Sequence, residues 1–114
     1  QCTARTLPTE LDAIFYLISP DNASLRAYKS TYVDGIERLL EHQTMLQAPS
    51  IIMSSTTRVY AFDDGRWVNE QTPLPQQDHH GQILQTAENQ ILAQPGGRVM
   101  RLAGLYGPTR CYTL

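Results

Sequence analysis

The first half of the chain passes from a continuous apolar run into an amphipathic pattern. Residues 13–18 are all apolar, and Ser19-Pro20-Asp21 ends the run. Such a run is typical of a strand covered on both faces. Over residues 24–42, apolar positions recur at steps of three and four with charged residues between them, which predicts a helix capped by Ser24. The expected buried set is Leu25, Tyr28, Tyr32, Val33, Ile36, Leu39 and Leu40.

The second half repeats this alternation after Pro49. Residues 50–54 predict a second strand, which runs into the hydroxyl side chains of Ser54, Ser55, Thr56 and Thr57. The segment 58–77 has no regular pattern, and loops of this length inside a compact domain are usually functional. A second helix is predicted over residues 81–93 and a third strand over residues 98–104, with Pro95-Gly96-Gly97 between them. The expected buried set of the second helix is Ile83, Leu84, Ala87, Ile91 and Leu92.

The order strand, helix, strand, helix, strand predicts an α/β fold. Each connection contains a helix and is therefore long enough to cross over between parallel strands. Ligands of open α/β sheets bind outside the carboxyl ends of the strands. The hydroxyl run at residues 54–57 follows such an end, so the sequence predicts a ligand site at this edge of the sheet.

Composition narrows the class of protein. The chain has 114 residues, 41% of them hydrophobic, which suits one globular domain or part of one. Its net charge of −2, with acids and bases interspersed, argues against nucleic acid or an anionic membrane as a partner. The longest apolar run is far too short to cross a bilayer, and no secretory signal opens the chain, so we expect a cytoplasmic protein. Cys2 and Cys111 lack metal-ligand spacing, and no cluster of metal-ligating residues is seen.

Several short motifs occur together in the order found in one enzyme family. Residues 54–60 read S-S-T-T-R-V-Y and residues 101–108 read R-L-A-G-L-Y-G-P. They resemble the S-S-x-x-V-Y and R-x-x-x-x-Y-G-P stretches of the extended short-chain dehydrogenases, the NAD-dependent epimerase/dehydratase family. The D-A-I-F-Y-L run at 12–17, Val33-Asp34-Gly35 and Thr86-Ala87-Glu88 resemble three further stretches of that family. Each motif is weak alone, but together they cover nearly the whole chain.

This resemblance implies the central part of a Rossmann-type doubly wound parallel sheet, equivalent to its strands four to six. The family's G-x-x-G-x-x-G turn, which holds the cofactor pyrophosphate at a helix N-terminus, does not occur here. Because the chain also begins at Gln1 rather than methionine, we expect residues 1–114 to be a fragment of a single NAD(P)-binding domain. The glycine-rich first half and the C-terminal substrate region would then lie outside it.

The resemblance also implies ligands and contacts. The cofactor would be NAD or NADP, and the substrate a nucleotide-sugar-like or other small hydroxy or carbonyl compound; a homodimer is left open. The positions matching the cofactor contacts are Leu17, Ile18, Ser19, Ser54, Ser55, Ala103, Gly104 and Leu105. For Ser54 and Ser55 the alternative role is a hydrogen bond to neighbouring backbone.

The chain departs from the family in the catalytic pair. Family members carry Tyr-x-x-x-Lys on a helix, and the lysine lowers the tyrosine pKa so that it exchanges a proton while the cofactor exchanges hydride. Counting back from Glu88, the tyrosine position holds His80 and the lysine position holds Leu84. Lys29 is the only lysine in the sequence. The chain therefore resembles an atypical branch that lacks the pair.

Two residues remain as catalytic candidates, each with a structural alternative. Thr56 matches the family's catalytic Ser/Thr but can instead cap backbone at a strand end. His80 can exchange protons near neutral pH or can simply be an exposed residue at a helix start. The sequence thus allows an NAD(P)-dependent enzyme or a non-catalytic dinucleotide-binding sensor or scaffold with a degenerate site. A third possibility is that the isolated piece is inactive. A phosphoacceptor receiver does not fit, because its acidic cluster is absent.

Overall fold

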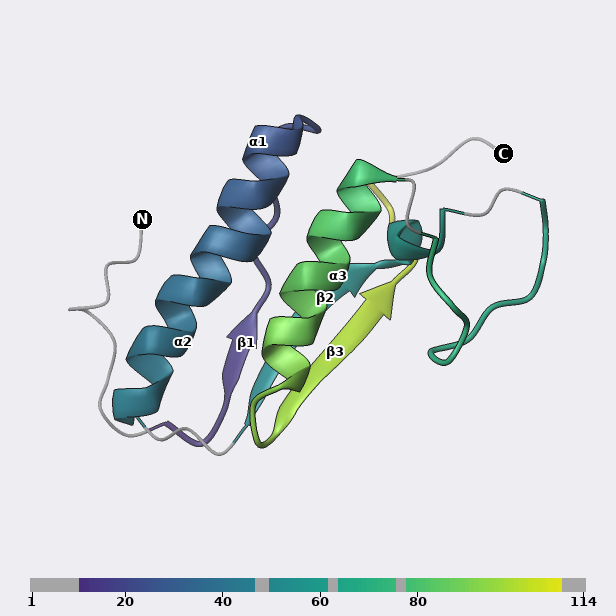
Figure 1. Cartoon of the computed structure of the whole chain (residues 1–114). Helices are drawn as coiled ribbons and strands as arrows, with labels where there is room; N and C mark the ends of the chain where they lie inside the picture. Colours follow the sequence, from purple (N-terminus) through teal and green to yellow (C-terminus); the bar gives the residue numbers. More distant parts are fainter. Residues whose placement is uncertain (1–10, 47–49, 62–63, 76–77, 110–114) are drawn as a thin grey trace.

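The computed structural model describes residues 11–46, 50–61, 64–75 and 78–109 (Figure 1). The elements along this part of the chain are β1 (Ile14–Tyr16), α1 (Leu25–Tyr28), the π-helical segment η2 (Lys29–Asp34), α2 (Gly35–Leu46), β2 (Ile51–Thr56), the short 3-10 helix η3 (Thr57–Tyr60), α3 (His79–Leu92) and β3 (Gly97–Leu102). The predicted alternation of strands and helices is confirmed. Cys2 and Cys111 lie outside the described residues.

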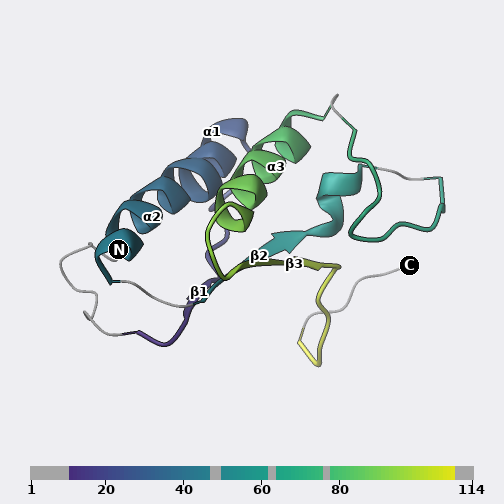
Figure 2. The ribbon, with the colours of Figure 1, turned by 60° about the horizontal axis from the view of Figure 1, so that its bottom comes forward.

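The three strands form one parallel sheet in the order β1-β2-β3. Ile14 pairs with Ile51 and Ile51 with Gly97, so the strands start level with one another. Figure 2 shows the helices on one face of this sheet. The fold is therefore a small α/β domain with helices over one face. No helix of the described residues is both long and apolar enough to cross a membrane.

The first helical region is continuous from α1 through η2 to α2 and ends at Leu46, four residues beyond the predicted end. Ser24 caps it as predicted, since its Oγ accepts a hydrogen bond from the Ala27 backbone N–H at 3.1 Å. Tyr32 and Ile36 are buried, but Leu25 is 43% exposed. The prediction that Leu25 is buried was wrong because this residue lies in the first turn, outside the core that α2 and the sheet enclose.

The second helix, α3, begins at His79, two residues before the predicted start. Asp78 is its N-cap, and its carboxylate accepts a hydrogen bond from the Gly81 backbone N–H at 3.0 Å. The Pro95-Gly96-Gly97 turn ends the helical region as expected, and Gly96 has φ 90° there. Leu92, the last residue of α3, is 55% exposed, so its predicted burial is wrong.

Strand β2 starts one residue later and ends two residues later than predicted, so it includes part of the hydroxyl run. Ser54, Ser55 and Thr56 all pair with β3, opposite Met100, Arg101 and Leu102. Only Thr57 leaves the sheet, where it begins η3. Backbone pairing with β3 thus outweighs the weak strand preference of serine.

The core lies between the sheet and the helices. Ile51 and Met53 from β2 are fully buried beneath Ile36 of α2 and Leu84 and Ile91 of α3. The remaining buried members are Tyr16, Tyr32, Val59, Tyr60 and Ala87. All of these come from helices or from alternate strand positions, which is the pattern of a sheet covered on one face.

Gly35, at the start of α2, leaves room for the Tyr16 side chain from β1. The Tyr16 hydroxyl donates a hydrogen bond to the Thr31 carbonyl of η2. Burial, and then the neighbouring Tyr32, raise the pKa of Tyr16, so the hydroxyl stays a proton donor. A Cβ at position 35 would overlap the Tyr16 hydroxyl oxygen and lie 3.4 Å from the ring carbon that carries it.

This geometry predicts that Gly35→Ala destabilises the natural chain but stabilises a Tyr16→Phe variant. In the natural chain we expect the substitution to destabilise by about 1–3 kcal/mol, because the new methyl group has no room. In a Tyr16→Phe background the overlap is gone, and alanine should stabilise the helix by up to about 1 kcal/mol. Urea unfolding of the four proteins measures both effects. An equal effect of Gly35→Ala in the two backgrounds would contradict this account of the contact.

Candidate functional site

The carboxyl ends of the three parallel strands lie at one edge of the sheet, as the register requires. Leu17, Ile18 and Ser19 follow β1 there and are exposed, and Ala103, Gly104 and Leu105 follow β3 and are also exposed. Thr56 ends β2 between them. The structure therefore places the predicted cofactor-contacting segments beside the hydroxyl run.

The hydroxyl run is divided between the two faces of the sheet. Ser55 points to the helix-covered face, is 5% exposed, and its Oγ has no hydrogen-bond partner among the described residues. The predicted alternative for Ser55, a bond to neighbouring backbone, is therefore wrong. The alternation of β2 puts Ser54 and Thr56 on the opposite face, both half-buried. Thr56 Oγ accepts a hydrogen bond from the Arg58 backbone N–H at 3.3 Å, which caps η3.

His80 is held by contacts to the first helical region. Its Nε2 lies 2.5 Å from the Ala23 carbonyl oxygen. A carbonyl only accepts, so Nε2 carries the proton and Nδ1 is the basic atom of the neutral ring. The ring also meets Tyr28 edge to face, with centroids 4.6 Å apart. His80 is thus half-buried and joins the loop before α1 to the first turn of α3, rather than being the exposed residue of the structural alternative.

Arg58 links the surroundings of Thr56 to those of His80. Its guanidinium lies 5.9 Å from the centre of the Tyr28 ring, the ring on which His80 packs. Its Nε lies 3.9 Å from the carboxylate of Asp78, the N-cap of α3. Thr56 and His80 are therefore connected only indirectly, through Arg58 and Tyr28. Arg58 was not predicted from the sequence, where its signal is a lone cation directly after the hydroxyl run.

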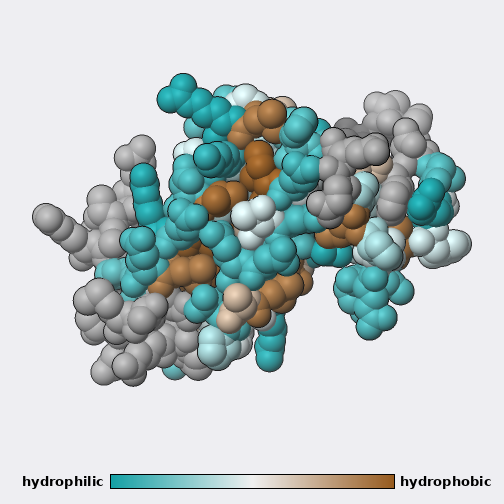
Figure 3. Space-filling view, in the orientation of Figure 1, coloured by the Kyte–Doolittle hydropathy of each residue, from teal (hydrophilic) through white to brown (hydrophobic). Residues whose placement is uncertain are grey.

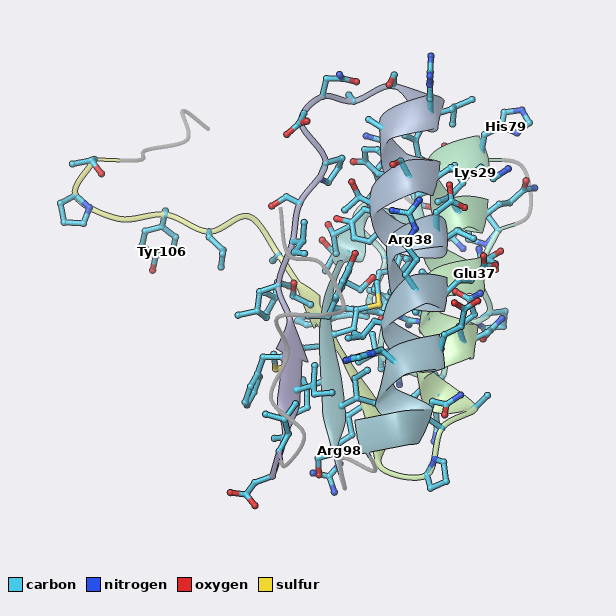
Figure 4. The ribbon with its side chains drawn as sticks, turned by 90° about the vertical axis from the view of Figure 1, so that its left-hand side faces the viewer. Lys29, Glu37, Arg38, His79, Arg98 and Tyr106 are labelled. Carbon is cyan, nitrogen blue, oxygen red and sulfur yellow. The ribbon has the colours of Figure 1, made fainter. Side chains whose placement is uncertain are left out.

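The position that matches the family's lysine lies inside the core. Leu84 has no exposed surface and packs among Ile51, Met53 and Ile91. Lys29 does not replace it, because it lies on the outer surface of the helical layer beside His79 (Figure 4). Lys29 and His79 border a groove of about 360 Å³ between η2 and α3. Leu25, Val33 and Ile83 give this groove its apolar lining. Figure 3 shows apolar surface, in brown, between the helices.

A buried ion pair ties the irregular segment after η3 to the sheet. Arg101 of β3 binds the Glu88 carboxylate through Nη2 at 2.7 Å and Nε at 3.1 Å, and Glu88 is only 2% exposed. Arg101 Nη1 donates to the Tyr60 hydroxyl at 3.1 Å, and that hydroxyl donates to the Asn69 carbonyl at 2.9 Å. The bond to Glu88 raises the pKa of Arg101 above its usual value. Both charges lie in the stretches that resemble the family's motifs, but their pairing was not predicted from the sequence.

The contacts of His80 predict a structural contribution that His79 lacks. His80→Ala removes the bond to the Ala23 carbonyl and the ring contact with Tyr28, and we expect a loss of about 1–2 kcal/mol. His79 is exposed on the same helical turn, so His79→Ala is the matched control and should change stability by under about 0.5 kcal/mol. Thermal or urea unfolding compares the two. Equal effects would mean that these contacts do not hold His80.

Comparison with known proteins gives one type of match. An 81-residue stretch is 35% identical to Protein YeeZ of Escherichia coli, both in strain K12 and in O157:H7. The match covers 69% of this chain and 29% of YeeZ, so the chain spans less than a third of the curated relatives that it matches. No protein-family model matches the chain, and no solved structure matches it significantly. The name YeeZ states no activity.

Proposed function

We propose that this chain is the central part of a Rossmann-type NAD(P)-binding domain in an epimerase/dehydratase-like protein. The observation that carries the proposal is the edge where three parallel strands end, with Thr56 between the exposed segments 17–19 and 103–105. Dinucleotides bind at this kind of edge in doubly wound sheets. The resemblance of residues 54–60 and 101–108 to the family's motifs supports the same assignment.

The residues at the edge suit a flat, partly polar ligand. Ala103 and Gly104 have little or no side chain, so a ring can approach their backbone closely. Leu17, Ile18 and Leu105 offer apolar surface on either side. The pyrophosphate of the cofactor needs a helix N-terminus with a glycine-rich turn. On this proposal that turn belongs to the part of the domain outside residues 1–114.

For an enzyme, Thr56 and His80 are the residues proposed to exchange protons, Thr56 on the open face of the sheet and His80 in the helical layer. When bound, the cofactor would exchange hydride with a substrate carbon, for which a nucleotide-sugar-like or other small hydroxy or carbonyl compound is the proposed class. Thr56 Oγ would hydrogen-bond the substrate oxygen and orient it. Arg58, next to Thr56 and near the Tyr28 ring, would supply positive charge for an anionic substrate group.

One observation favours the second candidate, a sensor or scaffold that binds the dinucleotide without catalysis. The family's lysine position holds Leu84, which is fully buried in the core. No cation therefore occupies this position to lower the pKa of an acid-base group. His80 is also committed to the Ala23 carbonyl and Tyr28, contacts that explain its place without any chemistry.

Neighbouring residues of the same type separate the two candidates. If the longer protein is an enzyme, Thr56→Ala should slow hydride exchange with nucleotide-sugar probes by about 10²-fold or more. Thr57→Ala, one residue further along in η3, should leave the rate unchanged. Rates that survive both Thr56→Ala and His80→Ala would remove these residues from the mechanism. Binding of NAD(P)H without any exchange in the natural protein would favour the sensor.

A further inference from the structure

Trp67 presents nearly its whole ring to solvent. It is the only tryptophan in the sequence, it lies in the segment 64–75 between η3 and α3, and it is 99% exposed. Val68 and Leu74 of the same segment pack against the core instead. The segment is thus attached to the domain by other apolar side chains, and the Trp67 ring remains open to a ligand.

The backbone on both sides of Trp67 is held by hydrogen bonds. Before it, the Asp64 carboxylate accepts from the Arg66 backbone N–H at 3.2 Å and from the Arg66 guanidinium Nη2 at 2.6 Å. After it, the Asn69 backbone N–H donates to Thr72 Oγ1 at 2.8 Å. A rigid ring on ordered backbone has little freedom to lose when a ligand stacks on it, which favours binding.

Further hydrogen bonds tie this turn to the sheet near the ends of β2 and β3. The Tyr60 hydroxyl donates to the Asn69 carbonyl and accepts from the Arg101 guanidinium of β3. Trp67 is two residues from Asn69, so their Cα atoms are at most about 7 Å apart. Figures 1 and 2 both show the segment beyond the carboxyl ends of β2 and β3, next to η3. Trp67 therefore lies on a connection at the edge that the proposed function assigns to ligands.

We propose that Trp67 stacks on the base of a nucleotide-sugar substrate and so selects such substrates over simple sugar phosphates. This proposal rests on the proposed function and names the part of the substrate that the ring binds. Any base can stack on an exposed aromatic side chain, because every base has a π-face. Arg58 of η3, whose side chain is 46% exposed, starts the same connection and would supply positive charge for the diphosphate. A ring face and a cation on one connection suit the two parts of a nucleoside diphosphate.

Two variants of the longer protein that contains residues 1–114 test this role. Affinity is measured for UDP-glucose, ADP-glucose and GDP-glucose, and for glucose 1-phosphate as a probe without a base. Trp67→Ala should weaken binding of the preferred nucleotide sugar by about 10- to 100-fold and leave binding of glucose 1-phosphate unchanged. Trp67→Phe keeps an aromatic ring and should retain most of the affinity. Because the side chain is exposed, both variants should unfold in urea at the natural midpoint.

Binding of NADH and NADPH to the same three proteins tests the proposed function separately, because this affinity should not depend on residue 67. An unchanged nucleotide-sugar affinity in Trp67→Ala would overturn the stacking role, and so would an equal loss for glucose 1-phosphate. The role would also be overturned if the natural protein bound NADH or NADPH but bound no nucleotide sugar more tightly than glucose 1-phosphate. Each of these results would leave the proposed NAD(P)-binding domain standing.

Discussion

Gly97→Ala is expected to prevent residues 1–114 from folding stably. A Cβ at this position would overlap the Ile91 carbonyl oxygen, and would lie 2.7 Å from the Ile91 carbonyl carbon and 3.1 Å from the Gln94 carbonyl oxygen. These are backbone atoms of α3 and its terminating turn, which cannot rotate away as a side chain can. We expect the free energy of unfolding to fall by at least about 3 kcal/mol, which is at or beyond the upper end of the usual range for overpacking a core. The total free energy of unfolding of a small domain is only about 5–15 kcal/mol.

Gly107→Ala is the matched control, because a Cβ there would meet nothing within 4 Å. Urea unfolding followed by circular dichroism should give a near-natural midpoint for Gly107→Ala and a much lower one, or no transition, for Gly97→Ala. A Gly97→Ala protein within about 0.5 kcal/mol of the natural chain would show that β3 does not start against the end of α3.

The second large effect is expected at the Glu88–Arg101 pair. Glu88→Gln keeps the shape of the side chain but leaves the Arg101 guanidinium, whose side chain is 18% exposed, without a counter-charge. Breaking a buried ion pair in this way costs about 3–5 kcal/mol. We expect a loss at the lower end of this range, because Arg101 also donates to the Tyr60 hydroxyl. A loss below about 1 kcal/mol would contradict the buried pairing.

Two further proteins separate the charge from the packing. Glu88→Leu and Arg101→Met are made singly and together. The double variant, which removes both charges, should lose much less free energy of unfolding than the sum of the losses in the two single variants. Asp64→Asn, in the exposed pair with Arg66, is the surface control and should have no measurable effect on unfolding. Additive effects of the two single substitutions would mean that Glu88 and Arg101 do not interact.

Local pattern was enough to predict the order of the elements. The apolar periods place the helices, and Ser24 caps the first one as its type suggests. The ends of elements were less predictable, because they depend on hydrogen bonds that the apolar pattern does not show. Strand β2 runs on through Thr56 because β3 pairs with it, and α3 starts early because Asp78 caps it. Neither contact can be read from the apolar pattern alone.

The candidate site was predictable in its location and less so in its contacts. Parallel strands necessarily bring segments 17–19, 54–56 and 103–105 to one edge. The contacts of His80 depend on how the first helical region packs on α3, which places Ala23 and Tyr28 against it. The pairing of Glu88 with Arg101 likewise depends on the packing of α3 over β3. These are tertiary contacts between residues 13 or more positions apart.

The most direct test of the central claim is a titration of NAD(H) and NADP(H) against both residues 1–114 and a longer protein that contains them. The account predicts saturable binding of one of these nucleotides by the longer protein, in the range of about 1 μM to 1 mM that is usual for enzyme ligands. It predicts no saturable binding by residues 1–114, which lack a glycine-rich turn for the pyrophosphate. Absence of binding by the longer protein, or tight binding by residues 1–114 alone, would contradict it.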